Sequence, residues 1–360
     1  MSWHEVRVAL HVHSRYSDGS GTVEQILAAA QGLVDVVWLT DHDGLAARTS
    51  PGEGRYGSVL LLVGTEMTPP TDHLLVLGTD FVPDREGSWA EAVQAVAQAG
   101  GLSFVAHPAD PGNAVLRLPS YRWTRREVRG FTGLEVWNHL SQWMRAVHGI
   151  GSGVNALAHP LRGAESPDPE VLALWDVMAA QERIVGVAGL DAHAVRIPHR
   201  RLGFPVFAYR SAFGWITNRV LVERRLQDAT LVEARAMLLA GFREGRVVMV
   251  NERRGHAAGL RVEGRAGSQT VAVGGEISWS GDAALLVTTP LAGRVTMVLE
   301  GHASGPHEVQ PGRVLSIPVP KPGAARVEIA VRKGSHVRPW AYSNPVYFRP
   351  PTLRRPRPDA

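Results

Sequence analysis

A change in residue pattern near Gly255 is the strongest constraint on the fold. Before it, apolar runs typical of strands alternate with segments of helical periodicity. The expected strands are Val6–Val12, Asp35–Thr40, Val59–Gly64, Leu74–Leu77, Leu102–Ala106, Leu134–Val136, Ile184–Leu190, Ile216–Val222 and Val247–Val250. The expected helices are Thr22–Gln31, Trp89–Ala99, Asp168–Glu182 and Leu231–Phe242. This alternation predicts an α/β fold built on a parallel sheet or barrel.

From about Gly259 to Tyr347 the sequence has no helical period. Short alternating or β-branched runs are separated by Gly, Pro and Ser, which predicts a small antiparallel β-sandwich. A chain of 360 residues has room for one large and one small domain. We therefore expect a large domain over residues 1–255, a β-sandwich over 256–348 and a flexible Pro/Arg-rich tail over 349–360.

Composition narrows the classes of partner and of metal site. The chain has no cysteine, so disulfides and thiolate ligands are excluded and any metal is held by imidazole or carboxylate. The net charge is +4, and the basic residues behind it are scattered along the chain. Their one cluster lies in the tail and consists of Arg349, Arg354, Arg355 and Arg357. A disordered tail explains this cluster better than a nucleic-acid arm does, although composition does not exclude nucleic acid.

The N-terminus lacks a signal-peptide pattern, and no apolar run approaches the roughly 18 residues of a membrane span. We therefore expect a cytoplasmic protein that does not enter membranes.

Histidines and carboxylates gather where the expected strands end. They occur in His11-Val-His13 with Ser17-Asp18-Gly19, Thr40-Asp41-His42-Asp43, Gly64-Thr65-Glu66, His73, Ala106-His107-Pro108 and Asp191-Ala192-His193. A spacing of two places His11 and His13 on one face of a strand. The C-terminal ends of strands are where sites form in barrels and open α/β sheets. Together these residues predict a multinuclear metal site.

Each of these residues alone has an ordinary structural reading. Asp18 is typical of a turn and Asp43 of a loop. His73 or His107, taken alone, is typical of a partly buried structural residue. Asp41 is expected to orient a neighbouring ring from outside the ligand shell. Mixed imidazole and carboxylate ligands favour Zn, Mn or Fe(II), and the sequence does not choose among them.

These motifs, HxH…SDG, TDH, GxE, HP and DxH in that order, resemble the PHP (polymerase and histidinol phosphatase) family over about residues 5–250. The resemblance implies a distorted (β/α)7 barrel with metal ions at its C-terminal rim, followed here by the β-sandwich. Leu134–Asn138, Leu174-Trp175-Asp176 and Tyr342-Ser-Asn-Pro are similar to the carbaryl-hydrolase-like branch.

The same resemblance implies two or three divalent ions and distributes their ligands. The first ion would be held by His11, His13, Glu66 and Asp191, the second by Glu66, His73 and His107, and the third by Asp18, His42 and His193. Glu66, Asp191 and His193 are the expected catalytic residues. His159 lies in a second Ala-His-Pro triplet and is the alternative to His107.

Three functions remain open from the sequence. The first is a phosphoesterase in which a hydroxide between two ions attacks a small phosphate ester or a nucleotide. The second is a carbamate, carboxylic ester or amide hydrolase with the same site, and the third is a binding protein with a relic site. Arg162, Arg196, Arg200 and Asn138 are candidate substrate-binding residues. Arginines that converge on the ions would favour phosphate. Trp143 is a candidate pocket residue, whereas Trp137 is expected in the core.

Overall fold

The structure is a computed structural model that describes residues 3–159, 164–194, 196–197, 204–205 and 207–351. It is mostly β, with 21% helix and 36% strand. The prediction of an α/β fold with a (β/α)7 barrel is therefore wrong. The described ranges contain 7 helices, and their strands form sheets of 12, 5, 4 and 2 strands instead of a ring covered by helices.

The largest sheet runs through both halves of the chain in the order β16-β23-β21-β22-β13-β12-β1-β2-β4-β3, with β18 paired to β21 and β19 paired to β18. Its N-terminal strands are β1 (His4–Val12), β2 (Val36–Leu39), β3 (Gly54–Tyr56), β4 (Val59–Val63), β12 (Ile216–Val222) and β13 (Val247–Asn251). Strands β1, β2 and β4 are parallel, whereas β12 and β13 are antiparallel to their neighbours.

The five-stranded sheet has the order β5-β6-β7-β8-β9. Its strands are β5 (Thr65–Met67), β6 (Leu74–Leu77), β7 (Leu102–Val105), β8 (Gly133–Asn138) and β9 (Val185–Gly189). Strands β5, β6 and β7 pair antiparallel, and β7, β8 and β9 pair parallel. These antiparallel pairs explain why the barrel prediction fails, because apolar periodicity identifies a strand but does not give its pairing direction.

The helices are α1 (Val23–Ala30), α2 (Trp89–Gln98), α3 (His139–Arg145), α4 (Ile150–Ala158), α5 (Pro169–Ala179), α6 (Tyr209–Ala212) and α7 (Leu231–Arg243). Capping boxes begin α1, at Thr22 and Gln25, and α7, at Thr230 and Glu233. No helix within the described ranges is both long and apolar enough to cross a bilayer.

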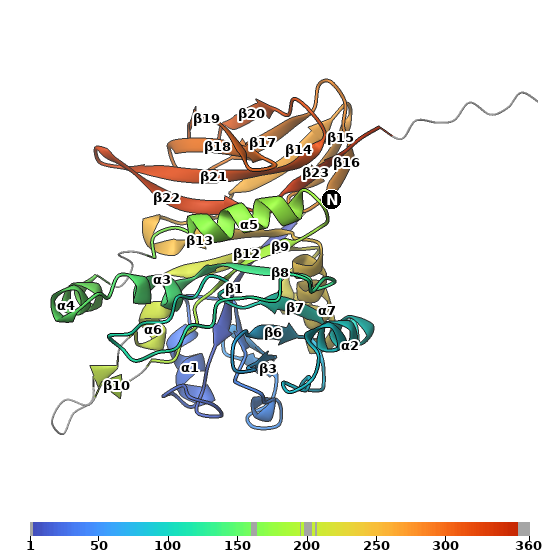
Figure 1. Ribbon diagram of the computed structural model, residues 1–360. Helices are drawn as coiled ribbons and strands as arrows, with labels where there is room; N and C mark the ends of the chain where they lie inside the picture. The colour runs from blue at the N-terminus through green and yellow to red at the C-terminus, as the bar shows by residue number, and fades with distance from the viewer. Residues whose placement is uncertain (1–2, 160–163, 195, 198–203, 206, 352–360) are drawn as a thin grey trace, which may run out of the picture.

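The C-terminal region consists of short strands stacked on the N-terminal half (Figure 1). They are β14 (Arg261–Ala266), β15 (Gln269–Ala272), β16 (Glu276–Ser278), β17 (Ala284–Thr288), β18 (Gly293–Leu299), β19 (His302–Val309), β20 (Val314–Pro318), β21 (Gly323–Lys333), β22 (His336–Ser343) and β23 (Val346–Arg349). A four-stranded sheet, β15-β14-β17-β20, shares an apolar core with the large sheet. The short β10 (Arg196–Ile197) and β11 (Phe204–Pro205) form a separate hairpin.

The large sheet crosses the predicted domain boundary at residue 255. Val248 of β13 pairs with Ser343 of β22, so the C-terminal strands extend the N-terminal sheet directly. Arg326 of β21 adds an ion pair with Asp176 of α5 at 2.6 Å, and α5 lies between the two halves (Figure 1). The predicted flexible tail begins inside β23 at Arg349, and its residues 352–360 lie outside the described ranges.

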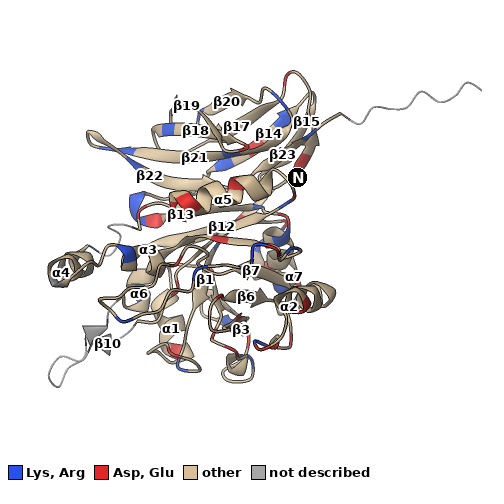
Figure 2. Ribbon diagram, viewed as in Figure 1, with Lys and Arg blue, Asp and Glu red and all other residues tan. Residues whose placement is uncertain are grey.

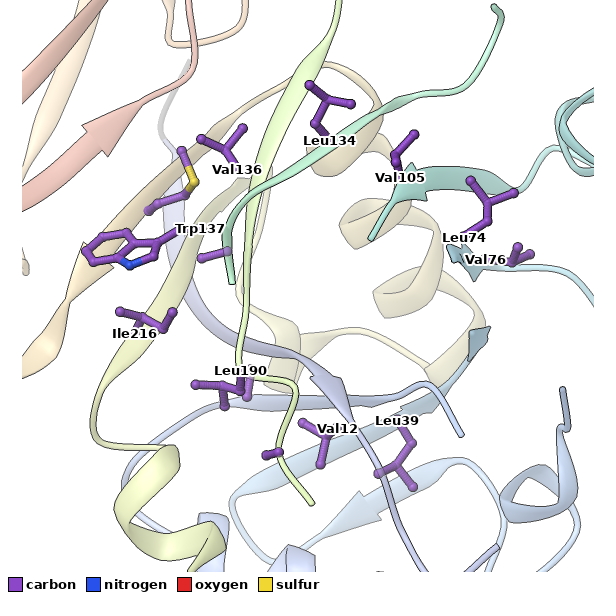
Figure 3. Packing of buried hydrophobic residues seen from close by; sticks show 14 of the residues in the cluster. Val12, Leu39, Leu74, Val76, Val105, Leu134, Val136, Trp137, Leu190 and Ile216 are labelled. Atoms are coloured by element: carbon purple, nitrogen blue, oxygen red, sulfur yellow. The ribbon is translucent and has the colours of Figure 1, made fainter. Parts of the chain in front are cut away.

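Buried apolar side chains join both sheets of the N-terminal half. Figure 3 shows Val12, Leu39, Leu74, Val76, Val105, Leu134, Val136, Trp137, Leu190 and Ile216 from this cluster. Trp137 is fully buried, as the sequence predicts. Basic and acidic residues are interleaved over both halves (Figure 2).

Candidate metal centre

The two N-terminal sheets meet where the predicted ligands lie. Parallel bridges join Val12, at the end of β1, to Ala192, and His42, after β2, to Glu66 in β5. His13 N donates to Ala192 O at 3.0 Å, which fixes this junction. The convergence of strand ends therefore gathers ligands that are far apart in the sequence.

Three of these residues have an unusual backbone. His11 (φ 64°), His107 (φ 26°) and Asp191 (φ 53°) lie in the left-handed region that non-glycine residues seldom adopt. A bulge between Leu10 and Val12 also interrupts β1, so simple strand alternation does not explain why His11 and His13 converge. Their rings nevertheless lie 5.1 Å apart. Strained backbone of this kind is concentrated at functional sites.

Glu66 is the centre of the cluster and is 1% exposed. Imidazole nitrogens of His11 (3.1 Å), His13 (3.3 Å) and His42 (3.1 Å) surround its Oε2, and those of His73 (3.0 Å) and His107 (3.1 Å) surround its Oε1. One carboxylate thus contacts imidazoles on both of its oxygens, the arrangement that bridging two cations requires.

Asp191 and Asp18 complete the cluster on the side nearer solvent. Asp191 Oδ1 lies 3.5 Å from Nε2 of both His11 and His13. Asp18 Oδ1 lies 3.1 Å from Nε2 of His193 and 3.4 Å from Nε2 of His42. The Asp18 side chain is 56% exposed, so the mouth of the site lies there.

All the predicted metal ligands are brought together. Four overlapping groups have donor atoms within 4.8 Å of one another: His13, Asp18, His42 and His193; His11, His107 and Asp191; His11, His13 and Glu66; and Glu66, His73 and His107. The donor atoms of these groups, which are mostly buried, lie within metal-binding distance. His159 is exposed at the end of α4, outside these groups, so His107 and not His159 lies against Glu66.

Two of the imidazole nitrogens beside Glu66 lack a hydrogen-bond partner among the described residues. His13 Nε2 and His42 Nδ1 are buried and lie close to Glu66, yet neither forms a hydrogen bond within the described part of the chain. Buried imidazole nitrogens without partners are costly unless something binds them. An ion between the imidazoles and the carboxylate would satisfy both.

Glu135 of β8 is a site residue that the sequence reasoning missed. Its Oε1 lies 2.7 Å from His11 Nδ1, and its Oε2 accepts from His107 N at 2.7 Å and Asn138 Nδ2 at 2.9 Å. It therefore holds one ring nitrogen of His11 and leaves Nε2 directed at Glu66, as carboxylates behind metal ligands do. A buried Glu within an expected strand was the available signal.

Asn138, a predicted substrate-binding residue, is already engaged by the protein. Its amide donates to Glu135 and, at 3.3 Å, to Asp191 Oδ2, and its Oδ1 accepts from Ser141 N at the start of α3. It is 4% exposed. These contacts favour positioning of Asp191 over contact with substrate.

Asp41 and Asp43 hold loops beside the cluster. Asp41 was expected to orient a ring, but among the described residues its carboxylate accepts from Ser14 N at 2.6 Å and Ser17 Oγ at 2.7 Å, so it fixes the turn after β1. Asp43 accepts from Thr68 N at 2.9 Å. The structural reading of Asp43 is therefore the one that its contacts support.

The charges of the cluster shift the pKa values of its side chains. Burial tends to raise the pKa of Glu66, but the surrounding histidines, His11 foremost, bring that pKa well below its ordinary value. Burial tends to lower the pKa of His42, but the neighbouring carboxylates of Asp18 and Glu66 outweigh burial and raise that pKa to about 10. Without cations, protons therefore compensate the carboxylates, and metal binding would displace them.

The side chains of the three arginines predicted to bind substrate are not part of the described structure. Arg162 and Arg200 lie outside the described residues, and only the backbone of Arg196, in β10, is described. Next to the ligands lies a cavity of about 360 Å³ whose walls include Asp18, Asp191 and His193.

Comparison with known protein families finds no family model that matches this chain, and comparison with curated proteins finds no match.

Proposed function

We propose that this protein is a metal-dependent hydrolase of ester-type bonds. The observation that carries the proposal is the convergence of five histidines on the two oxygens of buried Glu66, with Asp191 and Asp18 beside them. Mixed imidazole and carboxylate donors suit Zn, Mn or Fe(II). Two or three ions would be accommodated by the overlapping donor groups.

Bound divalent ions would activate water at neutral pH and polarise the oxygen of the bond under attack. Glu66 would hold neighbouring ions together, and Glu135 would keep the His11 ring oriented through its Nδ1. Asp191 is oriented by Asn138. Asp18, Asp191 and His193 line the adjoining cavity, which makes them the cluster residues best placed to contact a bound substrate.

The order of the motifs supports a proposal of distant kinship with the PHP family, in which phosphoester hydrolysis is the expected chemistry. A second candidate, hydrolysis of a carboxylic ester or carbamate, is favoured by the adjoining cavity. Its described lining is dominated by Leu, Trp, Phe and Ala side chains and includes no Lys or Arg. Phosphate recognition normally employs such cations.

The test is metal analysis and turnover of the purified full-length chain. Protein loaded with Mn, Zn or Fe(II) would be assayed with p-nitrophenyl phosphate, bis-p-nitrophenyl phosphate, p-nitrophenyl acetate and a naphthyl carbamate. We expect metal-dependent turnover of one class that is lost in Glu66→Gln and retained in Glu91→Gln, a control on the exposed face of α2. Bound metal with no turnover of any substrate would favour the relic-site alternative.

A further inference from the structure

Tyr121 faces the metal-ligand cluster from the segment between β7 and β8. The centroid of its ring lies 4.3 Å from that of His73 and 6.3 Å from that of His107. Both histidines contact Oε1 of Glu66, and these three residues form one of the groups that could hold an ion. Tyr121 therefore covers the side of the cluster that lies at His73 and His107.

A buried carboxylate anchors this segment beside His73. Asp72, the residue before His73, is fully buried. Its Oδ1 accepts from Thr124 N at 2.5 Å, and its Oδ2 lies 3.2 Å from Arg125 Nε. Such a carboxylate holds its partners firmly, because losing them would leave a buried charge unsatisfied. The backbone just after Tyr121 is thus tied to the neighbour of a predicted metal ligand.

A second anchor ties the same segment to the other histidine. Trp123 N donates to the carbonyl oxygen of Pro108, the residue after His107, at 3.0 Å, and the Trp123 side chain is buried in the core. Because the segment is held beside both histidines, the ring of Tyr121 is in place before any ligand binds. A hydrogen-bond donor fixed in this way needs no reorganisation during a reaction.

The hydroxyl of Tyr121 is available to a ligand. The residue is partly exposed, and its hydroxyl makes no hydrogen bond to any residue that the structure describes. Tyr209, which also lies against the cluster, differs because its hydroxyl donates to His13 O at 2.8 Å. Tyr209 therefore supports the backbone, whereas the hydroxyl of Tyr121 can donate to a bound molecule.

The charges around Tyr121 indicate where its hydroxyl lies. Burial foremost, and then the negative charges of Asp110, Glu66 and Asp18, raise the pKa of Tyr121. The hydroxyl is therefore within electrostatic range of both the centre of the cluster, at Glu66, and its mouth, at Asp18. Cations bound to these carboxylates would oppose the shift, so the shift bears on the position of the hydroxyl and not on its ionisation in the loaded protein.

Building on the proposed hydrolase function, we propose that Tyr121 is a further catalytic residue, whose hydroxyl donates a hydrogen bond to the substrate oxygen that gains negative charge as the ester-type bond is attacked. The proton stays on the phenol, so no bond to Tyr121 forms or breaks. Asp72 is a positioning residue that acts through the segment it anchors. A fixed hydroxyl donor at a developing oxyanion stabilises the transition state.

Tyr121→Phe keeps the ring on His73 and removes only the hydroxyl. In metal-loaded full-length protein, we expect kcat for the best ester substrate to fall at least about tenfold and KM to change less than about threefold, because the lost contact is made in the transition state. Metal content should match the wild type. Tyr56→Phe is the matched control, since it removes a hydroxyl that donates to Pro51 O at 3.0 Å beside β3.

A binding measurement tests the same contact without turnover. Inorganic phosphate resembles the tetrahedral, negatively charged group formed during such a hydrolysis, and it is titrated into metal-loaded protein by calorimetry. Tyr121→Phe should weaken phosphate binding roughly tenfold, the loss expected for one hydrogen bond to a charged group. Tyr56→Phe should bind phosphate as the wild type does.

Asp72→Asn tests the positioning role. The variant keeps one acceptor oxygen for Thr124 N and loses the charge beside Arg125. We expect kcat to fall severalfold in the wild-type background and hardly at all in the Tyr121→Phe background, since both changes remove the same contact. Equal losses in the two backgrounds would contradict a role for Asp72 that acts through Tyr121.

The outcomes separate this inference from the function on which it rests. Wild-type kcat and phosphate affinity in Tyr121→Phe would overturn the inference and leave the hydrolase standing. Loss of bound metal in that variant would also overturn it, because Tyr121 would then be a metal ligand or a support for His73. If the wild type turns over no ester, the hydrolase is contradicted, and phosphate decides: weaker binding in Tyr121→Phe supports Tyr121 as an anion contact, and unchanged or absent binding overturns it.

Discussion

The metal-ligand cluster and the aromatic cavity beside it, whose lining includes Trp143, Phe207 and Trp215, are neighbours built in opposite ways. The cluster consists of imidazoles and carboxylates at strand ends, and every member except His73 belongs to a short motif that the sequence displays. The cavity is formed by side chains of α3, of the turn around Leu116 and of the residues about α6, which share no motif. The comparison teaches that the reaction type can be read from local patterns, whereas selectivity depends on surfaces that only the folded chain assembles.

The largest expected effect tests whether Glu66 unites the cluster. Glu66→Gln keeps the size of the side chain and removes its charge, so metal affinity should fall by more than the roughly 10- to 100-fold typical of losing an outer hydrogen bond. Metal analysis after dialysis against a competing chelator measures this, with Glu91→Gln as the control. Wild-type metal content and activity in Glu66→Gln would contradict a bridging role.

A glycine beside the cluster provides a second test, of whether close packing around Glu135 and His11 supports metal binding. A Cβ on Gly189 would overlap the Glu135 carboxylate and press on His11. Gly189→Ala should therefore displace Glu135, reduce metal affinity and lower the free energy of unfolding by about 1–3 kcal/mol through overpacking. Metal titration and urea unfolding measure the two effects. Gly151→Ala is the control, because its added Cβ meets no atom within 4 Å.

Removing the support of His11 should have a smaller effect. Glu135→Gln retains the shape but weakens the hold on His11 Nδ1, so metal affinity should fall roughly 10- to 100-fold. Competition titration with a chelator of known affinity measures the change. An unaltered affinity would show that the ring is held by packing alone.

The pH dependence of the metal-free protein tests the charge balance of the cluster. The pKa of His42 is about 10 in the fold and 6.5 ordinarily, and that of His107 is about 9, since the carboxylates beside these rings outweigh burial. Raised pKa values add stability below pH 6.5 that is lost as pH rises through 9 to 10. Urea unfolding in chelator should show stability falling over this interval, and metal-loaded protein should show a smaller fall. Constant metal-free stability would contradict protonated histidines.

A substitution in the cavity is expected to have the smallest effect on the metal centre. Trp143→Leu should change metal affinity by no more than about twofold, because separate sites act nearly independently. The same chelator competition measures it. A large loss of metal in this variant would show that cluster and cavity are a single unit, and would remove the contrast drawn between them.

Prediction from the sequence was accurate for local segments. Leu74–Leu77 and Ile216–Val222 are strands with the expected bounds, and the helix at Trp89 differs by one residue at its end. Their assembly was predicted wrongly, because β5 and β6 pair antiparallel and the large sheet continues from β13 into β22. Pairing depends on contacts between distant segments, which periodicity does not encode.

The sequence by itself determined the kinds of ligand and their places at strand ends, since histidines and carboxylates beside apolar runs are a local pattern. Only the tertiary structure decided that His107 and not His159 joins Glu66, that Glu135 supports His11, and that an aromatic cavity adjoins Asp191. The physical reason is that the role of a buried carboxylate or an aromatic ring is set by its neighbours, and here those neighbours come from strands and loops far apart in the chain.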